Sequence, residues 1–297
     1  MGKTQKAVII GIILLPVFLG MFYRYLGETQ KSVSVMPGTS RIGYLEINDV
    51  IYSSSYIVKA LSGFAKTKNL SGVLIRVNSP GGAVAPCQEI YSKIEKLKDK
   101  GIKIVVSMGN VAASGGYYVS VPADRIFANQ GTLTGSIGVI IQYPQYNEML
   151  NKIGVKVKTI KAGNLKDVGN PSREMNPGEE VFMQNLIDDT HSKFIEDVAE
   201  YRSLSDSQLT LISDARVLTG RQAINSGLVD TLGSLSEAED YIKKTCNVPS
   251  GAKMITPDKK DFKNLFSDFT GSVISDIFGI RVNNSRKYGC FFLTDGF

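Results

Sequence analysis

Short apolar blocks and helical periodicities alternate along most of the chain. Residues 72–77, GVLIRV, form an almost continuous apolar run, which is typical of a strand covered on both faces of a sheet. Similar patterns predict strands at 42–47, 102–107 and 125–128, and helices at 54–67 and 89–98. This alternation predicts an α/β fold with a largely parallel sheet.

A long helix is expected to begin near Asn176. Asn176, Pro177 and Glu179 fit a helix cap, a proline at the first helical position and a glutamate that bonds back to the cap. Apolar residues then mark one face, at positions 183, 187, 194 and 198. His191 lies on this face and is interpreted as a packed or partly buried helix residue, because spacing places no second titratable group beside it.

The amino-terminal segment is apolar enough to span a membrane. Residues 7–23 carry no charge and lie between Lys6 and Arg24. A spanning helix needs about 20 apolar residues, so this run is at the short end of the range. The alternative is a cleaved signal peptide, but no small-x-small cleavage site follows the run. We therefore expect a cytoplasmic tip and transmembrane anchor at residues 1–26 and a polar tether at 27–40.

Composition narrows the class of protein. Hydrophobic residues make up 43% of the 297 residues and charged residues 21%, which is an ordinary globular balance. The net charge is +6, but the lysines form no basic stripe, so nucleic acid is not an expected partner. Three distant cysteines argue against a disulfide framework. A single histidine excludes an HExxH site, and we expect no metal and no cofactor.

The first of three glycine-rich segments follows the strand predicted at 72–77. It reads RVNSPGG over residues 76–82 and places Gly81 and Gly82 at the strand end. Adjacent glycines let the backbone approach a ligand closely and direct N–H groups toward it. Such donors are what an oxyanion hole needs, although a plain tight turn is the alternative.

The second segment, GNVAASGGYY at residues 109–118, leads from a strand into a small-residue helix. This position presents Ser114 at a helix amino terminus, with the Gly115 N–H nearby as an oxyanion donor. Taken alone, Ser114 is equally consistent with a helix N-cap.

The third segment, KAGNLKD at residues 161–167, follows a strand-like run at 155–160. A lysine acts as a general base only when it is neutral, and its ordinary pKa is about 10.4. Lys166 is a candidate for this role, and Lys161 is its rival within the same segment.

Together, these segments resemble the signal peptide peptidase A family of the Clp-protease/crotonase superfamily. The matching motifs, in order, are residues 78–82 (NSPGG), 113–115 (ASG), 134–139 (TGSIGV) and 161–167 (KAGNLKD). The resemblance extends over residues 41–244 and implies a Clp-protease/crotonase-like fold of repeated β-β-α units. We expect the peptidase domain at residues 41–250.

The resemblance also implies a role for individual residues. Ser114 is the implied nucleophile, Lys166 its general base, and Ser136 orients the lysine. The amides of Gly81 and Gly115 form the implied oxyanion hole, and Gly82 contacts the substrate. Attack by the serine would give an acyl-enzyme, which water then hydrolyses.

The chain holds one copy of the motif set, as in the half-length bacterial members that it resembles. The resemblance implies a ring-shaped homo-oligomer in which serine and lysine meet across a subunit boundary. We therefore expect Ser114 and Lys166 to be too far apart for a hydrogen bond within one chain.

The implied function is a membrane-anchored serine endopeptidase that degrades released signal peptides and similar hydrophobic peptides. Its catalytic domain would lie on the extracytoplasmic side of the bacterial inner membrane, held by one transmembrane helix. Two alternatives keep the fold: a catalytically inactive membrane scaffold, and a crotonase-like enzyme acting on an acyl-coenzyme A. The acidic residues and adenine-binding context of the second are not recognisable.

Residues 251–297 are expected to form a C-terminal extension. Apolar residues at positions 262, 266, 269, 273 and 277 predict one face of an amphipathic helix. Packing against the body or a neighbouring subunit is the first interpretation, and association with a membrane surface is the alternative. Residues 283–297 match no pattern and are assigned no role.

Overall fold

The computed structural model describes residues 40–257 and 291–293. The predicted anchor, the tether up to residue 39 and the predicted C-terminal amphipathic helix lie outside the described residues. Among the residues that are described, no helix is both long enough and apolar enough to cross a membrane.

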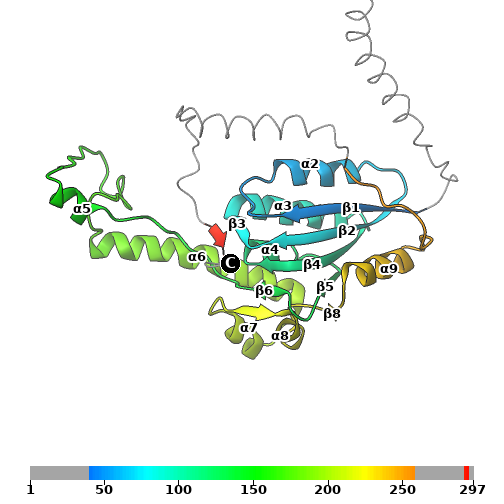
Figure 1. Cartoon of the computed structure of the whole chain (residues 1–297). Coiled ribbons are helices and arrows are strands. Elements are labelled where there is room, and N and C mark those ends of the chain that lie inside the picture. The colour runs from blue at the N-terminus through cyan, green and yellow to red at the C-terminus, as the bar shows by residue number, and fades with distance from the viewer. Residues whose placement is uncertain (1–39, 258–290, 294–297) are drawn as a thin grey trace, which may run out of the picture. The chain divides into compact units, whose positions relative to one another are not determined.

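A parallel sheet forms the centre of the described body (Figure 1). Its strands run in the order β1 (Arg41–Asn48), β2 (Leu70–Ser79), β4 (Lys103–Ala113), β5 (Arg125–Ala128) and β8 (Thr231–Leu232). Each neighbouring pair in this order is parallel. Two short strands extend the sheet, with β6 (Leu133–Gly135) parallel to the end of β4 and β7 (Val217–Thr219) antiparallel to β6. The predicted α/β fold with a largely parallel sheet is confirmed.

Helices cover both faces of this sheet. The described helices are α2 (Ser55–Phe64), α3 (Val84–Lys98), α4 (Gly115–Tyr118), α5 (Asn147–Lys152), α6 (Pro177–Arg202), α7 (Asp206–Ile212), α8 (Gly220–Asn225) and α9 (Leu235–Thr245). Along β2, Val73 and Ile75 point into the larger core with α2 and α3, whereas Leu74 packs with α9 on the opposite face. Because successive strand residues point to opposite faces, a strand covered on both sides needs the continuous apolar run seen in the sequence.

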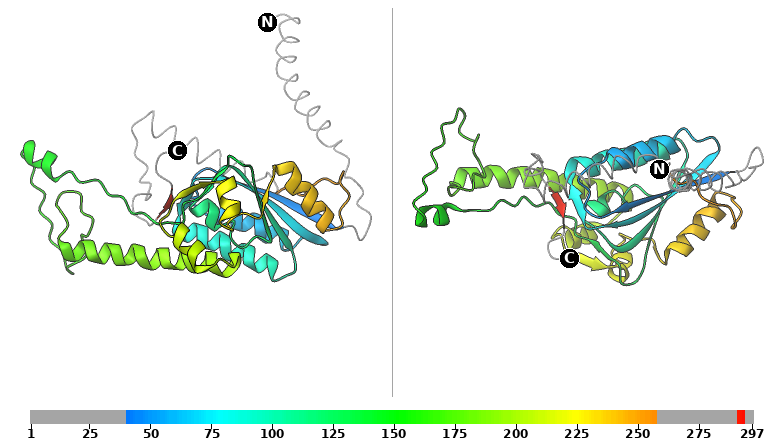
Figure 2. Two further views of the ribbon diagram at one scale, coloured as in Figure 1. Left: turned by 90° about the horizontal axis from the view of Figure 1, so that it is seen from below. Right: turned by 45° about the horizontal axis from the view of Figure 1, so that its top comes forward.

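The cap predicted for the long helix is present at the start of α6. The Asn176 side chain accepts a hydrogen bond from the Glu179 amide at 3.0 Å, and the Glu179 side chain accepts one from the Asn176 amide at 3.1 Å. Phe194 and Val198 are buried as expected from the apolar face. The amino-terminal half of α6 extends beyond the sheet, together with α5 and the loops around it (Figure 2).

The strand-like run at 155–160 does not form a strand, so this prediction is wrong for the isolated chain. Its residues are exposed, including Val157 at 57% and Ile160 at 90%. The alternation of apolar and polar residues is typical of a strand, but a strand also needs a neighbour for its backbone hydrogen bonds. Within the described residues this segment has no such neighbour.

Two features near the chain's C-terminal part were not predicted. The body continues past residue 250, because Ile255 bonds to β1: Tyr44 N donates to Ile255 O at 2.8 Å and Ile255 N donates to Ile42 O at 2.8 Å. In addition, β9 (Phe291–Leu293) pairs antiparallel with β3 (Gly81–Ala83). A segment that was assigned no role therefore lies against the glycine-rich turn.

Candidate active site

Ser114 lies at the junction between β4 and α4, in a strained backbone conformation. Its φ is +53° and its ψ is −118°, a region that residues with a side chain rarely adopt. The residue is fully buried. Its amide donates to Gly135 O at 2.8 Å, and its Oγ donates to Gly138 O at 3.4 Å. A serine held on a strained turn between strand and helix is the geometry of an activated nucleophile in α/β hydrolases.

The glycine-rich turn at 78–82 packs directly against the helix that follows Ser114. At Gly116, an added Cβ would lie 2.5 Å from Ser79 O, so only glycine allows this approach. The Asn78 Oδ1 accepts hydrogen bonds from Asn110 N at 3.0 Å and Val111 N at 3.3 Å, which ties the turn to β4. Two motifs joined by hydrogen bonds between positions 32 residues apart in sequence are thereby brought into one site.

The two amides predicted for the oxyanion hole differ in their surroundings. Within the described part of the chain, the Gly115 N–H has no acceptor, as expected for the first residue of a helix. The Gly81 N–H instead donates to the Ser79 Oγ at 3.1 Å. Ser79 was not singled out in the sequence. Its hydroxyl would compete with an incoming oxyanion for the Gly81 donor.

Gly82 lies in the middle of β3, which is bonded along both edges. On one edge, Ile51 N donates to Gly81 O at 2.8 Å and Ala83 N donates to Ile51 O at 2.9 Å. On the other edge Gly82 is in register with Phe292 of β9. The position predicted to contact the substrate is thus occupied by a segment of the same chain.

Ser136 lies at the end of β6, beside Ser114. The register pairs Ala113 with Gly135, so the two serines follow equivalent ends of neighbouring parallel strands. Ser136 also has a positive φ, +51°, and its amide donates to Arg216 O at 2.9 Å. The structure therefore brings Ser136 to the same edge of the sheet as the predicted nucleophile.

His191 connects α6 to the turn that follows Ser136. Its Nε2 lies 2.9 Å from the backbone oxygen of Ile137, and the ring is partly buried. The interpretation of His191 as a packed helix residue is confirmed. Its partner was not recognisable, because the contact joins positions 54 residues apart in sequence.

Lys166 is not brought to Ser114. It is exposed on the loop between α5 and α6, which lies beyond the amino-terminal end of α6 and away from α4 (Figure 1). Its amide donates to Gly163 O at 3.2 Å within a turn. Among the described residues, the Lys166 side chain has no hydrogen bond to Ser114 or to Ser136. One chain thus gathers Ser114, Ser136 and the glycine amides, and leaves Lys166 apart.

Four charged residues around this loop form an ion-pair network: Lys161, Asp167, Arg173 and Glu179. Arg173 pairs with Asp167 at 2.9 Å and with Glu179 at 2.6 Å, and Lys161 pairs with Asp167. Hydrogen bonds from Arg173, and then from Lys161, hold the pKa of Asp167 well below its usual range. Hydrogen bonds from Arg173 and the Asn176 amide lower the pKa of Glu179 to about 2.

The contribution of Glu179 to the stability of the protein should therefore decrease at acid pH. Because its folded-state pKa is about 2 and its ordinary value is 4.5, the carboxylate stabilises the folded state fully above pH 4.5. That contribution is lost as the pH falls toward about 2. We expect the difference in Tm between wild type and Glu179→Gln to shrink between about pH 6 and about pH 3. The exposed Glu196→Gln on the same helix is the matched control, and an equal shrinkage in both variants would contradict the assignment.

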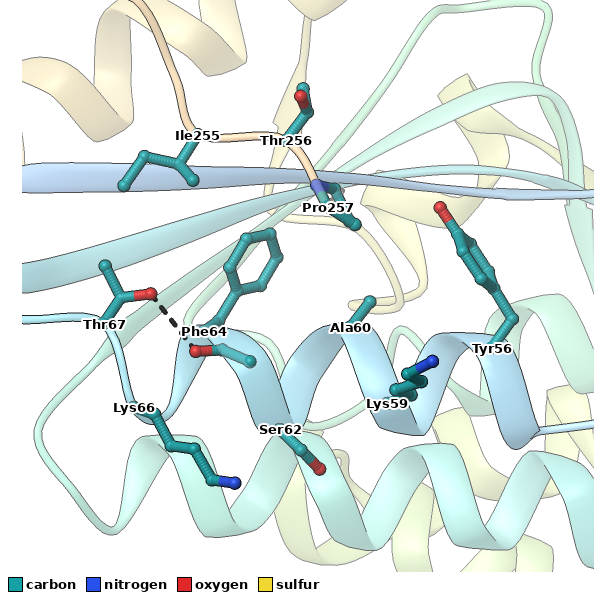
Figure 3. Close-up of a pocket in the computed structure, with 11 residues that line it drawn as sticks. Tyr56, Lys59, Ala60, Ser62, Phe64, Lys66, Thr67, Ile255, Thr256 and Pro257 are labelled. Carbon is teal, nitrogen blue, oxygen red and sulfur yellow. Dashed lines mark hydrogen bonds between the residues drawn. The ribbon is translucent and has the colours of Figure 1, made fainter. Parts of the chain in front are cut away.

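The described residues also form a cavity of about 460 Å³ between α2 and residues 255–257 (Figure 3). Phe64, Ala60 and Pro257 form part of its wall, with Lys59 and Tyr56 at its side. None of the candidate site residues lines it. Within the described residues no group of three potential metal ligands occurs.

Comparison with known proteins shows which family the chain resembles. The profile described as Peptidase family S49 matches residues 96–249. A "Putative protease" of Synechocystis sp. is 40% identical over 203 residues, covering 68% of this chain and 73% of that protein. The "Putative signal peptide peptidase SppA" of Enterococcus faecium is 31% identical over 290 residues, covering 93% of this chain and 84% of that protein.

Solved structures show weaker similarity. A ClpP1 mutant from Listeria monocytogenes superposes with a TM-score of 0.45 and 17% identity, covering 66% of this chain and 93% of that one. A mutant of the membrane-bound stomatin-specific protease 1510-N gives a TM-score of 0.47 and 16% identity, covering 74% and 93%.

The α/β fold and the strained, buried serine define an enzyme of the serine-hydrolase class. The chain belongs to peptidase family S49 and is a serine peptidase similar to signal peptide peptidase A.

Proposed function

We propose that the protein is a membrane-anchored endopeptidase that uses a Ser114–Lys166 dyad to cleave released signal peptides and similar hydrophobic peptides. The observation that carries the proposal is the buried, strained Ser114 beside the glycine-rich turn and Ser136. In this mechanism the Ser114 Oγ attacks the scissile carbonyl while neutral Lys166 takes its proton. The resulting acyl-enzyme is then hydrolysed by water, with Ser136 orienting the lysine.

The dyad is completed by a neighbouring subunit. Lys166 lies on the loop beyond the sheet, so a second copy of the chain has to present its own lysine to the first copy's serine. The amino-terminal half of α6 supports such an assembly, because Val181, Phe182 and Leu186 are exposed on it. Large apolar side chains gathered on one exposed helix are typical of a protein–protein interface.

The segment at 155–160 supports the same assembly. It has the alternating pattern of a strand but no strand partner within the described residues of its own chain. Backbone groups without a partner are readily satisfied by strand addition to another chain. In the proposed ring, this segment pairs with the neighbouring subunit, and the lysine motif follows it directly in sequence.

Substrate peptides bind in an extended conformation along β3. The pairing of β9 with Gly81–Ala83 supports this mode, because it places an extended segment antiparallel on that strand. Main-chain hydrogen bonds to a strand edge recognise any extended peptide, and apolar pockets supply selectivity. A hydrophobic peptide would replace β9 along the same edge.

The anchor completes the proposal. Residues 7–23 would hold the enzyme in the bacterial inner membrane, with the catalytic domain on the extracytoplasmic side. Signal peptides remain in that membrane after release, so the anchor keeps enzyme and substrate in the same plane. No cofactor is needed for this chemistry.

Labelling with a fluorophosphonate tests the proposal. The reagent phosphonylates an activated serine with loss of fluoride, so we expect a covalent adduct on Ser114 in the full-length protein, mapped by mass spectrometry of peptides. We also expect the unlabelled protein to hydrolyse a hydrophobic peptide. Ser120→Ala is the matched control, because Ser120 is a buried serine just after α4 whose Oγ donates to Gly116 O. This variant should be labelled like wild type.

Other outcomes would refute the proposal. Absence of an adduct together with affinity for coenzyme A would indicate the crotonase-like enzyme instead. Absence of both an adduct and peptide turnover would indicate the inactive scaffold.

A further inference from the structure

Arg173 joins a carboxylate in the lysine motif, Asp167, to a carboxylate in the first turn of α6, Glu179. Its Nε and Nη2 donate to the Asp167 carboxylate at 3.0 and 2.9 Å. Its Nη1 and Nη2 donate to the Glu179 carboxylate at 2.7 and 2.6 Å. A guanidinium carries its donors in a rigid plane, so two forked pairs fix both the separation and the orientation of the groups that they join.

One end of this connection is anchored in a helix. Glu179 is 3% exposed and takes part in the cap of α6, where its side chain accepts from the Asn176 amide at 3.1 Å. The other end reaches the lysine motif, because Asp167 directly follows Lys166 in sequence. Arg173 Nη2 also donates to the backbone oxygen of Asp167 at 3.2 Å. The backbone beside Lys166 is thereby linked to the first turn of α6.

The same network engages the rival lysine. The Lys161 Nζ bonds to the Asp167 carboxylate and donates to Asn164 O at 2.6 Å. The Lys161 ammonium is therefore bound within its own loop. Of the two lysines in the motif at 161–167, Lys161 forms a salt bridge within the described residues and Lys166 forms none, so Lys166 stays available to a second chain.

We propose that Arg173 is a positioning residue for the general base Lys166, acting through Asp167 and Glu179. The proposal rests on the proposed function, because it concerns the base of that reaction. The lysine sits on an exposed loop far from its serine, and a misplacement of about 1 Å can cost about 100-fold in rate. Two forked ion pairs, one to Asp167 beside the lysine and one to Glu179 of α6, supply the rigidity that the loop itself lacks.

Replacement of Arg173 should therefore lower the rate of the chemical step more than substrate binding. In the full-length oligomer we expect Arg173→Ala to reduce kcat by about 10-fold or more while KM for a hydrophobic peptide changes by less than about 2-fold. Arg173→Lys keeps the charge but loses the forks, so it should recover only part of the loss. Arg125→Ala, which removes an arginine that bonds to Thr231, is the matched control and should keep the wild-type kcat.

A second variant keeps the test decisive if Arg173→Ala fails to fold or assemble. Asp167→Asn retains the size of the side chain and removes the negative charge that pairs with Arg173, so kcat should fall in this variant also. Wild-type kcat in Arg173→Ala or Asp167→Asn, with Lys166→Ala inactive in the same assay, would overturn the positioning role alone. Full activity in Lys166→Ala would instead overturn the proposed function.

Discussion

Mixing two inactive variants, Ser114→Ala and Lys166→Ala, is expected to restore peptide hydrolysis that neither shows alone. Each single variant should lose activity by about 10³-fold or more, because nucleophile and base act as one unit. In a mixed ring, a subunit with intact Ser114 can receive an intact Lys166 from its neighbour. Random assembly of equal amounts should make about one quarter of the subunit boundaries competent.

The measurement is the rate of hydrolysis after the two proteins are dissociated and reassembled together. A double variant that lacks both residues provides the control, because mixing it with either single variant supplies only half of the dyad. No recovery in the mixture, with both single variants inactive and the oligomer intact, would mean that serine and lysine meet within one chain.

This test follows from the distribution of the site in the structure. Ser114, Ser136 and the glycine amides share one edge of the sheet, where hydrogen bonds such as Ser114 N to Gly135 O hold them together. The Lys166 loop is held to α6 by the ion-pair network instead. The serine side of the site and the lysine loop are each held by their own set of contacts. A site assembled between subunits requires such an arrangement.

The convergence of Ser114 and Gly81 was predictable because each follows a predicted strand, whereas Ser136 was expected in the site only from the family resemblance, since β6 was not predicted. Parallel strands end at the same edge of a sheet, so residues placed just after them converge. The capping box at Asn176 and Glu179 was predictable for a similar reason, since it depends on spacing within one helix turn. Local pattern and sheet topology were sufficient for these features.

Hydrogen bonds made by individual side chains within the turns and loops were not predictable. The Ser79 hydroxyl accepts a hydrogen bond from the Gly81 amide, and Arg173 donates to Asp167 and Glu179. No pattern in the sequence marks these partners. The failed strand at 155–160 has a related cause. Its alternation is correct for a strand, but pairing depends on a neighbour that the described residues of one chain do not provide.

Charging the exposed apolar surface of α6 is expected to break the assembly and, with it, the activity. Phe182→Asp combined with Leu186→Asp places two carboxylates where 39% and 40% exposed apolar side chains now lie. Burial of a charge in an interface without a partner is strongly unfavourable, so the oligomer should dissociate into monomers. Since each monomer lacks a lysine beside Ser114, peptide hydrolysis should fall about as far as in Lys166→Ala.

The readouts are the molar mass in solution and the rate of peptide hydrolysis, measured on the same preparation. Leu211→Asp is the matched control, because Leu211 is 43% exposed on α7 and lies outside the proposed interface. It should change neither the molar mass nor the rate. A monomeric double variant that still hydrolyses the peptide would show that one chain can complete the dyad, whereas an intact, active oligomer would place the subunit interface on another surface.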